Sequence, residues 1–143
     1  AMLPFIGYNV GDYFAHWLEM GAGADPEKLP RMYWVNWFRK DADGGFMWPG
    51  FGDNSRILKW VMERLDGTAE AEPNAIGLAP GPNSIDRNGL NLTDDDMAAL
   101  LAVDDDAWQD EADLIEQHYA RVGERLPEEL QSQLADLRRR LST

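Results

Sequence analysis

Cysteine is absent from the 143 residues of the sequence, which excludes a disulfide framework and thiolate chemistry. Long apolar runs are absent as well. None approaches the roughly eighteen residues that a membrane-spanning helix needs, so we expect neither a membrane span nor a membrane partner. Residues 1–6 lack the basic and apolar stretches of a signal peptide. These absences are compatible with a cytoplasmic protein, and that is the location we expect.

Positive charge is scarce and unevenly distributed. The chain has 13 basic and 26 acidic residues, and its formal net charge is −13. Residues 1–60 contain seven acids and six bases, whereas residues 61–143 contain nineteen acids and seven bases. So acidic a chain repels phosphate backbones, and we expect no nucleic-acid partner. The acidic half is typical of a solvated surface, and the nearly neutral half is the natural place for a ligand.

The sequence also lacks the usual catalytic signatures. It has no Gly-Lys-Ser/Thr motif and therefore no phosphate-cradling P-loop. His16 and Glu19 are spaced to share a helix face, but the only other histidine, His118, is far along the chain, which favours a packed or surface histidine over a metal ligand. The aspartate triplets at 94–96 and 104–106 are better explained as helix caps than as cation ligands. We expect no catalytic residue and no metal ligand in this chain.

Aromatic residues are concentrated at one end. Thirteen of the fifteen lie before position 61, and the densest part runs from Asn36 to Asn54, interleaved with glycine and proline. A core strand favours β-branched side chains and few glycines, because glycine loses the most backbone entropy on folding. Large rings between glycines are better suited to gripping a flat ligand. The composition of this segment therefore predicts a binding site.

The loop at residues 49–54 is the strongest candidate for that site. Glycines on both sides of Phe51 allow the backbone to approach a ligand while the ring stacks on it. Asn54 carries a donor and an acceptor that could read the edge of a base. Phe38 and Phe46 flank the neighbouring turn, so three rings could converge on one heterocycle, each stacked face contributing about 1–3 kcal/mol. The alternative is that these rings cap a small core beneath a hairpin, and spacing alone favours neither.

The aromatic segment also predicts a small β element. Met32–Phe38 is a short apolar run after Pro30 with alternate side chains on two faces, which is typical of a buried strand. Asp43-Gly44 is a strong turn signal. Residues 46–48 are a candidate return strand, which Pro49 would end. We therefore expect a strand or hairpin beneath the aromatic loop.

Helical spacing dominates the rest of the chain. Asp12 is a candidate cap for a helix that ends near Gly21, and a second helix follows Asn54 as far as Asp66-Gly67. Residues 68–92 are rich in proline, glycine and asparagine, which predicts a long connection with at most an edge strand. Residues 93–143 begin with a variant of the capping box. Two apolar helical stripes follow. The first is Trp108, Ala112, Ile115, Tyr119 and Val122, and the second, after Pro127, is Leu130, Leu134, Leu137 and Leu141.

The fold class expected from these patterns is α+β and predominantly helical. We divide the chain into an aromatic binding portion at 1–67, the connection at 68–92 and acidic C-terminal helices at 93–143. All three are expected to be parts of one larger catalytic domain, for the following reason.

Two motifs of the aromatic segment closely resemble GTP-dependent phosphoenolpyruvate carboxykinase. They read Asn-Trp-Phe-Arg-Lys-Asp at 36–41 and Phe-Met-Trp-Pro-Gly-Phe-Gly-Asp-Asn at 46–54. The long aromatic motif is highly specific. The similarity covers most of the chain, thins over the acidic helices, and includes residues 2–9, residues 16–18, residues 29–31 and the helix after Asn54.

The resemblance implies a guanine pocket. In the family, phenylalanines matching Phe38 and Phe51 sandwich the guanine, and the one matching Phe46 lies beside them. The loop that begins at Phe51 contacts the base edge, and the residue matching Asn54 helps to select guanine over adenine. Many members have glutamate where this chain has Asp53, a change that keeps the charge. The nucleotide-binding residues implied are Phe38, Phe46, Phe51, Gly52, Asp53 and Asn54.

The resemblance also implies a reaction and a parent enzyme. The family enzyme decarboxylates oxaloacetate and phosphorylates the enolate with GTP, giving phosphoenolpyruvate, carbon dioxide and GDP in gluconeogenesis. It needs a divalent metal, manganese or magnesium. The family enzyme is several times longer than this chain, is expected to be a monomer, and has its P-loop and metal ligands before the matched part. We therefore expect a C-terminal segment that binds the nucleotide together with the remainder of the enzyme and is inactive alone.

Two other functions remain open from the residues themselves. The aromatic loop could stack on a sugar ring as the platform of a stand-alone carbohydrate-binding module. Alternatively, the acidic helices could form an interaction module in which the loop has no role.

Overall fold

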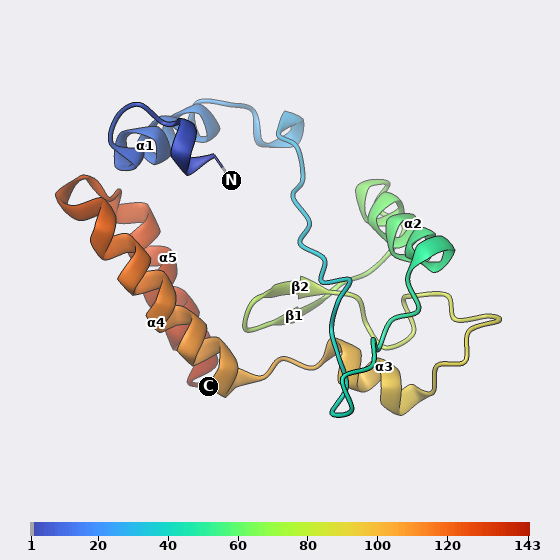
Figure 1. Ribbon diagram of the computed structural model, residues 1–143. Helices are drawn as coiled ribbons and strands as arrows, with labels where there is room; N and C mark the ends of the chain where they lie inside the picture. The colour runs from blue at the N-terminus through green and yellow to red at the C-terminus, as the bar shows by residue number, and fades with distance from the viewer. Residues whose placement is uncertain (1) are drawn as a thin grey trace. The chain divides into compact units, whose positions relative to one another are not determined.

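The computed structural model describes residues 2–143 and shows helices joined by long connections, together with a two-stranded antiparallel sheet (Figure 1). The chain forms two compact units. The helical unit contains the described residues up to Pro30 together with Asp104–Thr143, and the central unit is Arg31–Val103.

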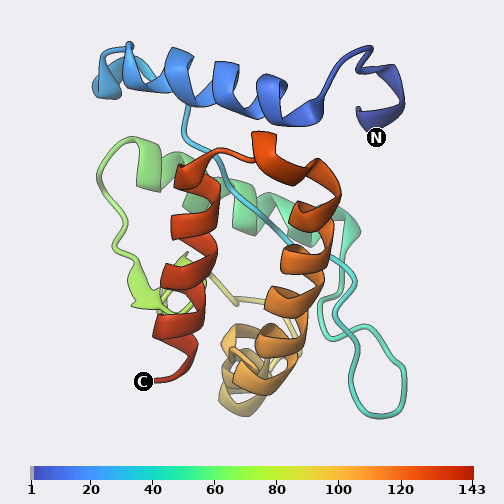
Figure 2. The same cartoon turned by 90° about the vertical axis from the view of Figure 1, so that its left-hand side faces the viewer.

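The helical unit contains the 3-10 helices η1 (Leu3–Phe5), η2 (Pro26–Lys28) and η4 (Gly123–Arg125) and the α-helices α1 (Val10–Ala22), α4 (Asp105–Val122) and α5 (Glu128–Leu141). Helices α4 and α5 lie side by side as an antiparallel hairpin, joined through η4 (Figures 1 and 2). Ala112 of α4 and Leu134 of α5 are buried. Both predicted C-terminal helices are thus confirmed, although Pro127 is the N-cap of α5 rather than a residue of its first turn.

Charged contacts on the same hairpin supplement this packing. Arg138 of α5 donates hydrogen bonds to Glu116 and Asp113 of α4, at 3.0 and 2.6 Å. These two carboxylates, Glu116 first, raise the pKa of Arg138 further above its ordinary value. The triplet at 104–106 caps α4 as expected, because the Asp104 side chain accepts a hydrogen bond from the Ala107 N–H at 3.0 Å.

The cap expected at Asp12 is wrong. Asn9 is the N-cap of α1, and its side-chain oxygen accepts a hydrogen bond from the Gly11 N–H at 2.7 Å. Because the Asn9 side chain caps the free Gly11 amide, the helix begins at Val10, and Asp12 lies within its first turn. Asp12 instead forms an ion pair with Arg125 of η4, and Gly11 lies against the Arg125 carbonyl. These contacts fix α1 across the η4 end of the hairpin (Figure 2).

The central unit contains η3 (Phe51–Asp53), α2 (Asn54–Leu65), β1 (Glu72–Asn74), β2 (Gly77–Ala79) and α3 (Asp94–Leu101). Strands β1 and β2 pair with Glu72 opposite Ala79. The capping box expected at the start of α3 is confirmed. The Thr93 hydroxyl accepts a hydrogen bond from the Asp96 N–H, and the Asp96 carboxylate accepts one from the Thr93 N–H. The hydrogen bonds from the Thr93 N–H and hydroxyl lower the pKa of Asp96.

The core of the central unit is centred on two tryptophans. Trp48 and Trp60 are 6% and 5% exposed, and they cluster with Ile85 and Met97, which are 3% exposed. Tyr33 packs edge-on against Trp60, with 6.3 Å between the ring centroids. The four buried residues come from the aromatic loop, α2, the connection before α3, and α3 itself. Burial of these large side chains therefore fixes the loop to both helices.

The buried strand expected at Met32–Phe38 is wrong. The segment is extended, and its side chains alternate as those of a strand do, since Met32 and Trp34 are 94% and 97% exposed and Tyr33 is 39% exposed. However, the backbone amides of residues 32–37 have no hydrogen-bond partner among residues 2–143. A strand requires a paired neighbour, and the part of the chain that the structure describes supplies none here.

The return strand expected at residues 46–48 is also absent from the described structure. Pairing is limited to one bridge between Lys40 and Phe46. Its two hydrogen bonds run from the Met47 N–H to the Arg39 carbonyl at 3.0 Å and from the Asp41 N–H to the Gly45 carbonyl at 2.9 Å. Pro49 has no N–H to extend the ladder. The strands lie instead at β1 and β2, inside the predicted connection. The α+β fold class is confirmed, and the functional division at 67 and 92 stays a prediction.

No helix within residues 2–143 is both long and apolar enough to span a membrane.

Replacing Gly11 by alanine should destabilise the helical unit, because the added Cβ would overlap the Arg125 carbonyl. Overpacking of this kind costs about 1–3 kcal/mol of unfolding free energy. Gly21→Ala is the matched control in α1, since its Cβ meets nothing within 4 Å and alanine should stabilise the helix by up to about 1 kcal/mol. Urea unfolding followed by circular dichroism measures both. Equal midpoints for the two variants would contradict the packing of α1 on η4.

Candidate functional site

A tight turn carries the first rings of the candidate site. The Asp41 carboxylate accepts a hydrogen bond from the Gly45 N–H at 2.8 Å, and the Asp41 N–H donates to the Gly45 carbonyl at 2.9 Å. Gly44 has φ of 82°, a left-handed conformation that glycine adopts at little cost. The Asp-Gly turn signal in the sequence is therefore confirmed. Its closure places Phe46 opposite Lys40.

Phe38 and Phe46 meet above this turn. Their ring centroids are 6.0 Å apart with an interplanar angle of 61°, an edge-on arrangement that aromatic pairs prefer. The Lys40 ammonium lies 5.4 Å from the Phe46 ring centroid, within cation–π range. Phe38 and Phe46 are 72% and 60% exposed, so they form a surface platform outside the core of the central unit.

Phe51 is presented by a strained backbone. It is the non-glycine residue with positive φ in the described chain, at 48°, and it follows Gly50 with φ of 77°. A non-glycine residue in this region costs on the order of 1–3 kcal/mol and clusters at ligand sites. The Phe51 ring is 96% exposed. The backbone thus directs a large apolar ring into solvent, where packing offers no compensation.

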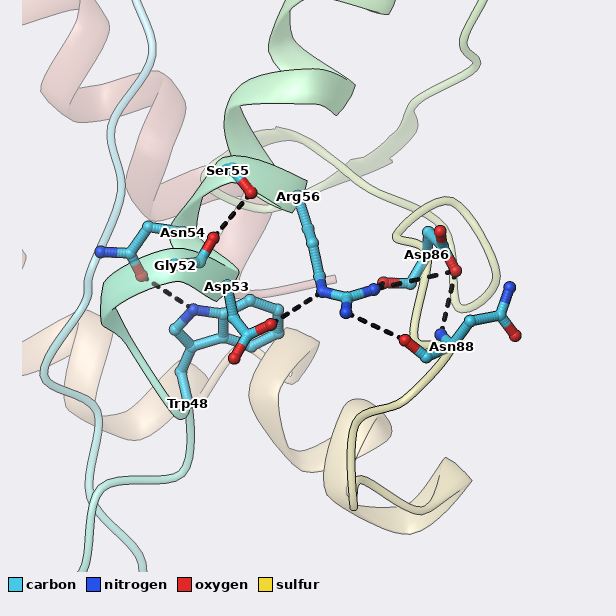
Figure 3. A network of polar contacts seen from close by, with 8 residues as sticks. All are labelled: Trp48, Gly52, Asp53, Asn54, Ser55, Arg56, Asp86 and Asn88. Carbon is cyan, nitrogen blue, oxygen red and sulfur yellow. Dashed lines mark hydrogen bonds and ion pairs between the residues drawn. The ribbon is translucent and has the colours of Figure 1, made fainter.

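Asn54, the first residue of α2, is tied to the core. The buried indole N–H of Trp48 donates a hydrogen bond of 3.0 Å to the Asn54 side-chain oxygen. Figure 3 shows the carboxamide nitrogen of Asn54 pointing away from that indole. Ser55 reinforces the start of the helix, since its hydroxyl donates to the Gly52 carbonyl at 2.6 Å. The orientation of the Asn54 carboxamide is therefore set by a residue of the core.

Asp53 is held by an arginine that spans two segments. The Arg56 Nε donates to the Asp53 carboxylate at 3.0 Å, one helical turn away. The other guanidinium nitrogens of Arg56 donate to the carbonyls of Asp86 and Asn88, each at 2.9 Å (Figure 3). The planar guanidinium thus joins η3 to the connection before α3.

The structure brings together only some of the predicted site residues. Phe38 and Phe46 contact each other. Within residues 2–143 no ring contact joins Phe51 to either of them, so the three rings do not form one stack. Gly52, Asp53 and Asn54 follow Phe51 directly in η3 and α2.

Sequence reasoning missed three residues that support this site: Trp48, Arg56 and Arg39. The Arg39 guanidinium donates to the Leu100 and Ala102 carbonyls at the end of α3, at 3.1 and 2.9 Å. The spacing of Asp53 and Arg56 was a usable signal, because residues three apart on a helix can pair. The long-range partners of Arg39 and Arg56 leave no local signal in the sequence.

The arrangement offers stacking surfaces and one oriented amide. Two exposed ring positions, at the turn and at Phe51, suit the two faces of a flat heterocycle. The Asn54 carboxamide can donate hydrogen bonds to the edge of such a ligand. Across residues 2–143 no cluster of three or more His, Asp or Glu residues is placed to hold a metal ion.

Comparison with known proteins shows which family the chain belongs to. The sequence model described as the phosphoenolpyruvate carboxykinase C-terminal P-loop domain matches residues 1–140. The chain belongs to this family. Curated relatives include the phosphoenolpyruvate carboxykinases (GTP) of Renibacterium salmoninarum and Paenarthrobacter aurescens, each 51% identical over 141 residues. The enzyme of Treponema pallidum is 46% identical over 143 residues.

These alignments span nearly the whole chain but only part of the relatives. Each covers 99% of this chain and 23% of the relative's length. The resemblance of the aromatic motif to GTP-dependent phosphoenolpyruvate carboxykinase is thereby confirmed. The P-loop in the name of the family has no Gly-Lys-Ser/Thr counterpart in these 143 residues.

Arg56→Ala should loosen the aromatic loop, because it leaves the Asp53 carboxylate and two loop carbonyls without their donor. We expect a loss of about 1.5–3 kcal/mol of unfolding free energy, typical of hydrogen bonds to a charged group. Lys59→Ala is the control in α2, since its ion pair with Glu63 is largely exposed and should contribute under about 1 kcal/mol. Urea unfolding followed by tryptophan fluorescence measures both. Similar losses in the two variants would contradict the bridging role of Arg56.

Proposed function

We propose that this chain is the guanine-binding segment of a phosphoenolpyruvate carboxykinase that uses GTP. The whole enzyme would convert oxaloacetate and GTP to phosphoenolpyruvate, carbon dioxide and GDP, a reaction of gluconeogenesis. The observation that carries the proposal is the presence of exposed rings at Phe38, Phe46 and Phe51 and of an oriented Asn54 in a chain of this family. A cytoplasmic enzyme that is monomeric and binds no nucleic acid is part of the same proposal.

Stacking would supply most of the affinity for the base. Phe38 and Phe51 would cover its two faces, with Phe46 packed against the edge of Phe38. Each stacked face contributes about 1–3 kcal/mol, and removal of exposed ring surface from water adds to it. Gly52 and Asp53 would lie beside the base edge and Asn54 would read it. The strained φ of Phe51 presents the ring before the ligand arrives, which lowers the ordering cost of binding.

The phosphates and the metal would be bound elsewhere in the enzyme. The residues of this chain do not fit a divalent cation, since residues 2–143 contain no suitable ligand cluster. No P-loop motif is present to cradle the triphosphate. We therefore assign this chain no step of phosphoryl transfer or decarboxylation, and its role is to bind and orient the nucleotide.

The remainder of the enzyme is the partner that we propose for the extended segment at 32–37. Its amides have no partner among the described residues, and Met32 and Trp34 are 94% and 97% exposed. Alternating side chains and unpaired amides are the properties of a strand that lacks its sheet. The relatives that this chain matches are more than four times its length, so a further sheet could be supplied by the rest of the protein.

Hydrogen–deuterium exchange of the full-length enzyme should therefore find the amides of residues 32–37 protected. In the isolated chain the same amides should exchange at the rate of unstructured peptide, because they lack acceptors. The amides of α2 provide an internal reference, since they are hydrogen-bonded in the chain itself. Rapid exchange of 32–37 in the full-length enzyme would rule out strand pairing there.

Replacing Phe51 by alanine in the full-length enzyme should weaken GDP binding about 5- to 150-fold, the equivalent of one stacked face. Phe5→Ala is the matched control, because Phe5 is also a largely exposed ring, at 88% against 96% for Phe51, but lies in the helical unit. Its effect on GDP affinity should be negligible. Titration of tryptophan fluorescence with GDP measures both variants.

Unchanged GDP affinity in Phe51→Ala would overturn the assignment of the site. A parallel titration with a soluble glycan separates this proposal from the carbohydrate-binding alternative, since a guanine site should ignore the sugar. Binding of the glycan but not of GDP would favour that alternative.

A further inference from the structure

We propose that Trp48 is a positioning residue that determines base selection, because it fixes the Asn54 carboxamide in one of its two orientations. This inference rests on the guanine site proposed above and adds the physical origin of its selectivity. Trp48 does not contact the ligand in this account. It acts through Asn54.

The donor chemistry of the indole makes the orientation unambiguous. The Trp48 Nε1 lies 3.0 Å from the side-chain oxygen of Asn54. An indole N–H can only donate, whereas a carboxamide presents an acceptor on one side and two donors on the other. A flipped Asn54 would set its NH2 against the indole N–H and leave a buried donor without a partner. The oxygen of Asn54 therefore faces the Trp48 indole, and its NH2 points away from the indole (Figure 3).

Both ends of this hydrogen bond are immobilised. Trp48 is 6% exposed and packs in the core cluster with Trp60, Ile85 and Met97. Asn54 begins α2, and its backbone N–H donates to the carbonyls of η3. The neighbouring Asp53 is fixed by Arg56. The hydrogen bond from Trp48 consequently favours one orientation of the carboxamide over its flipped alternative.

A carboxamide that could flip would be a poor discriminator. Guanine has the O6 acceptor where adenine has the N6 amino donor. An asparagine free to exchange its oxygen and nitrogen could satisfy either base. With its NH2 held on the side away from the indole, Asn54 complements O6 of guanine and opposes the amino group of adenine. Selectivity then depends on a hydrogen bond on the side of Asn54 away from the ligand.

The test is the ratio of the ADP and GDP dissociation constants in the full-length enzyme carrying Trp48→Phe. This variant keeps an aromatic ring in the core and removes the N–H. We expect the preference for GDP to fall roughly 3- to 10-fold, as expected for one neutral hydrogen bond. Stacking on the phenylalanines is common to both bases, so most of the change should be tighter ADP binding.

Trp60→Phe is a control of matched chemistry. Trp60 is 5% exposed, belongs to the same core, and has an indole N–H without a hydrogen-bond partner among the described residues. The same substitution there removes an N–H that orients nothing. Its ratio should stay within about 2-fold of the wild type, even if both variants lose a similar amount of stability.

A second variant avoids the core altogether. Asn54→Asp keeps an acceptor for the Trp48 N–H but presents an acceptor, not a donor, to the base. The GDP preference should be lost in this variant. In an Asn54→Ala background, Trp48→Phe should have no further effect on the ratio, because the two residues act through one contact.

The outcomes are distinguishable. An equal loss of GDP preference in Trp48→Phe and Trp60→Phe would overturn the positioning role of Trp48, as would a retained preference in Asn54→Asp. A wild-type enzyme that fails to bind GDP would instead overturn the proposed guanine site, and this inference with it.

Discussion

The structure depends most on the burial of Trp48 at the junction between the core of the central unit and its exposed aromatic loop. The indole is 6% exposed and packs with residues from α2, α3 and the connection between them. Its N–H donates a hydrogen bond to the side-chain oxygen of Asn54. Packing of the core holds the Trp48 indole in place, and the indole in turn orients the Asn54 carboxamide. Arg56 and Arg39 make the corresponding polar connections to loop and helix carbonyls.

The other rings of the loop have the opposite role. Phe38, Phe46 and Phe51 are kept out of the core by turn chemistry at Asp41 and by the left-handed backbone at Gly50 and Phe51. Exposed large rings on a strained backbone lower the stability of the folded chain. A flat ligand that covers the rings and removes them from water would offset this loss of stability. A loop built in this way is hydrogen-bonded at its base and apolar at its tip, and those properties suit recognition of a nucleobase.

The sequence predicted what is local and failed where partners are distant. Thr93 and Asp96, the Asp-Gly turn and the C-terminal apolar stripes depend on neighbours within a few residues, and all were found. Met32–Phe38 has the alternation of a strand, but pairing depends on another segment, and none is available among the described residues. The rings and Asn54 were proposed from composition and resemblance. The predicted return strand includes Trp48, and nothing local in the sequence reveals that its N–H reaches Asn54.

The central claim is that the exposed rings of this chain enclose a guanine, and a crystal structure of the full-length enzyme with GDP tests it most directly. The base should lie between the Phe38 and Phe51 rings, with the Asn54 NH2 within hydrogen-bonding distance of O6 and the Trp48 hydrogen bond to Asn54 intact. A base bound elsewhere, with these rings still exposed to solvent or packed against protein, would contradict it.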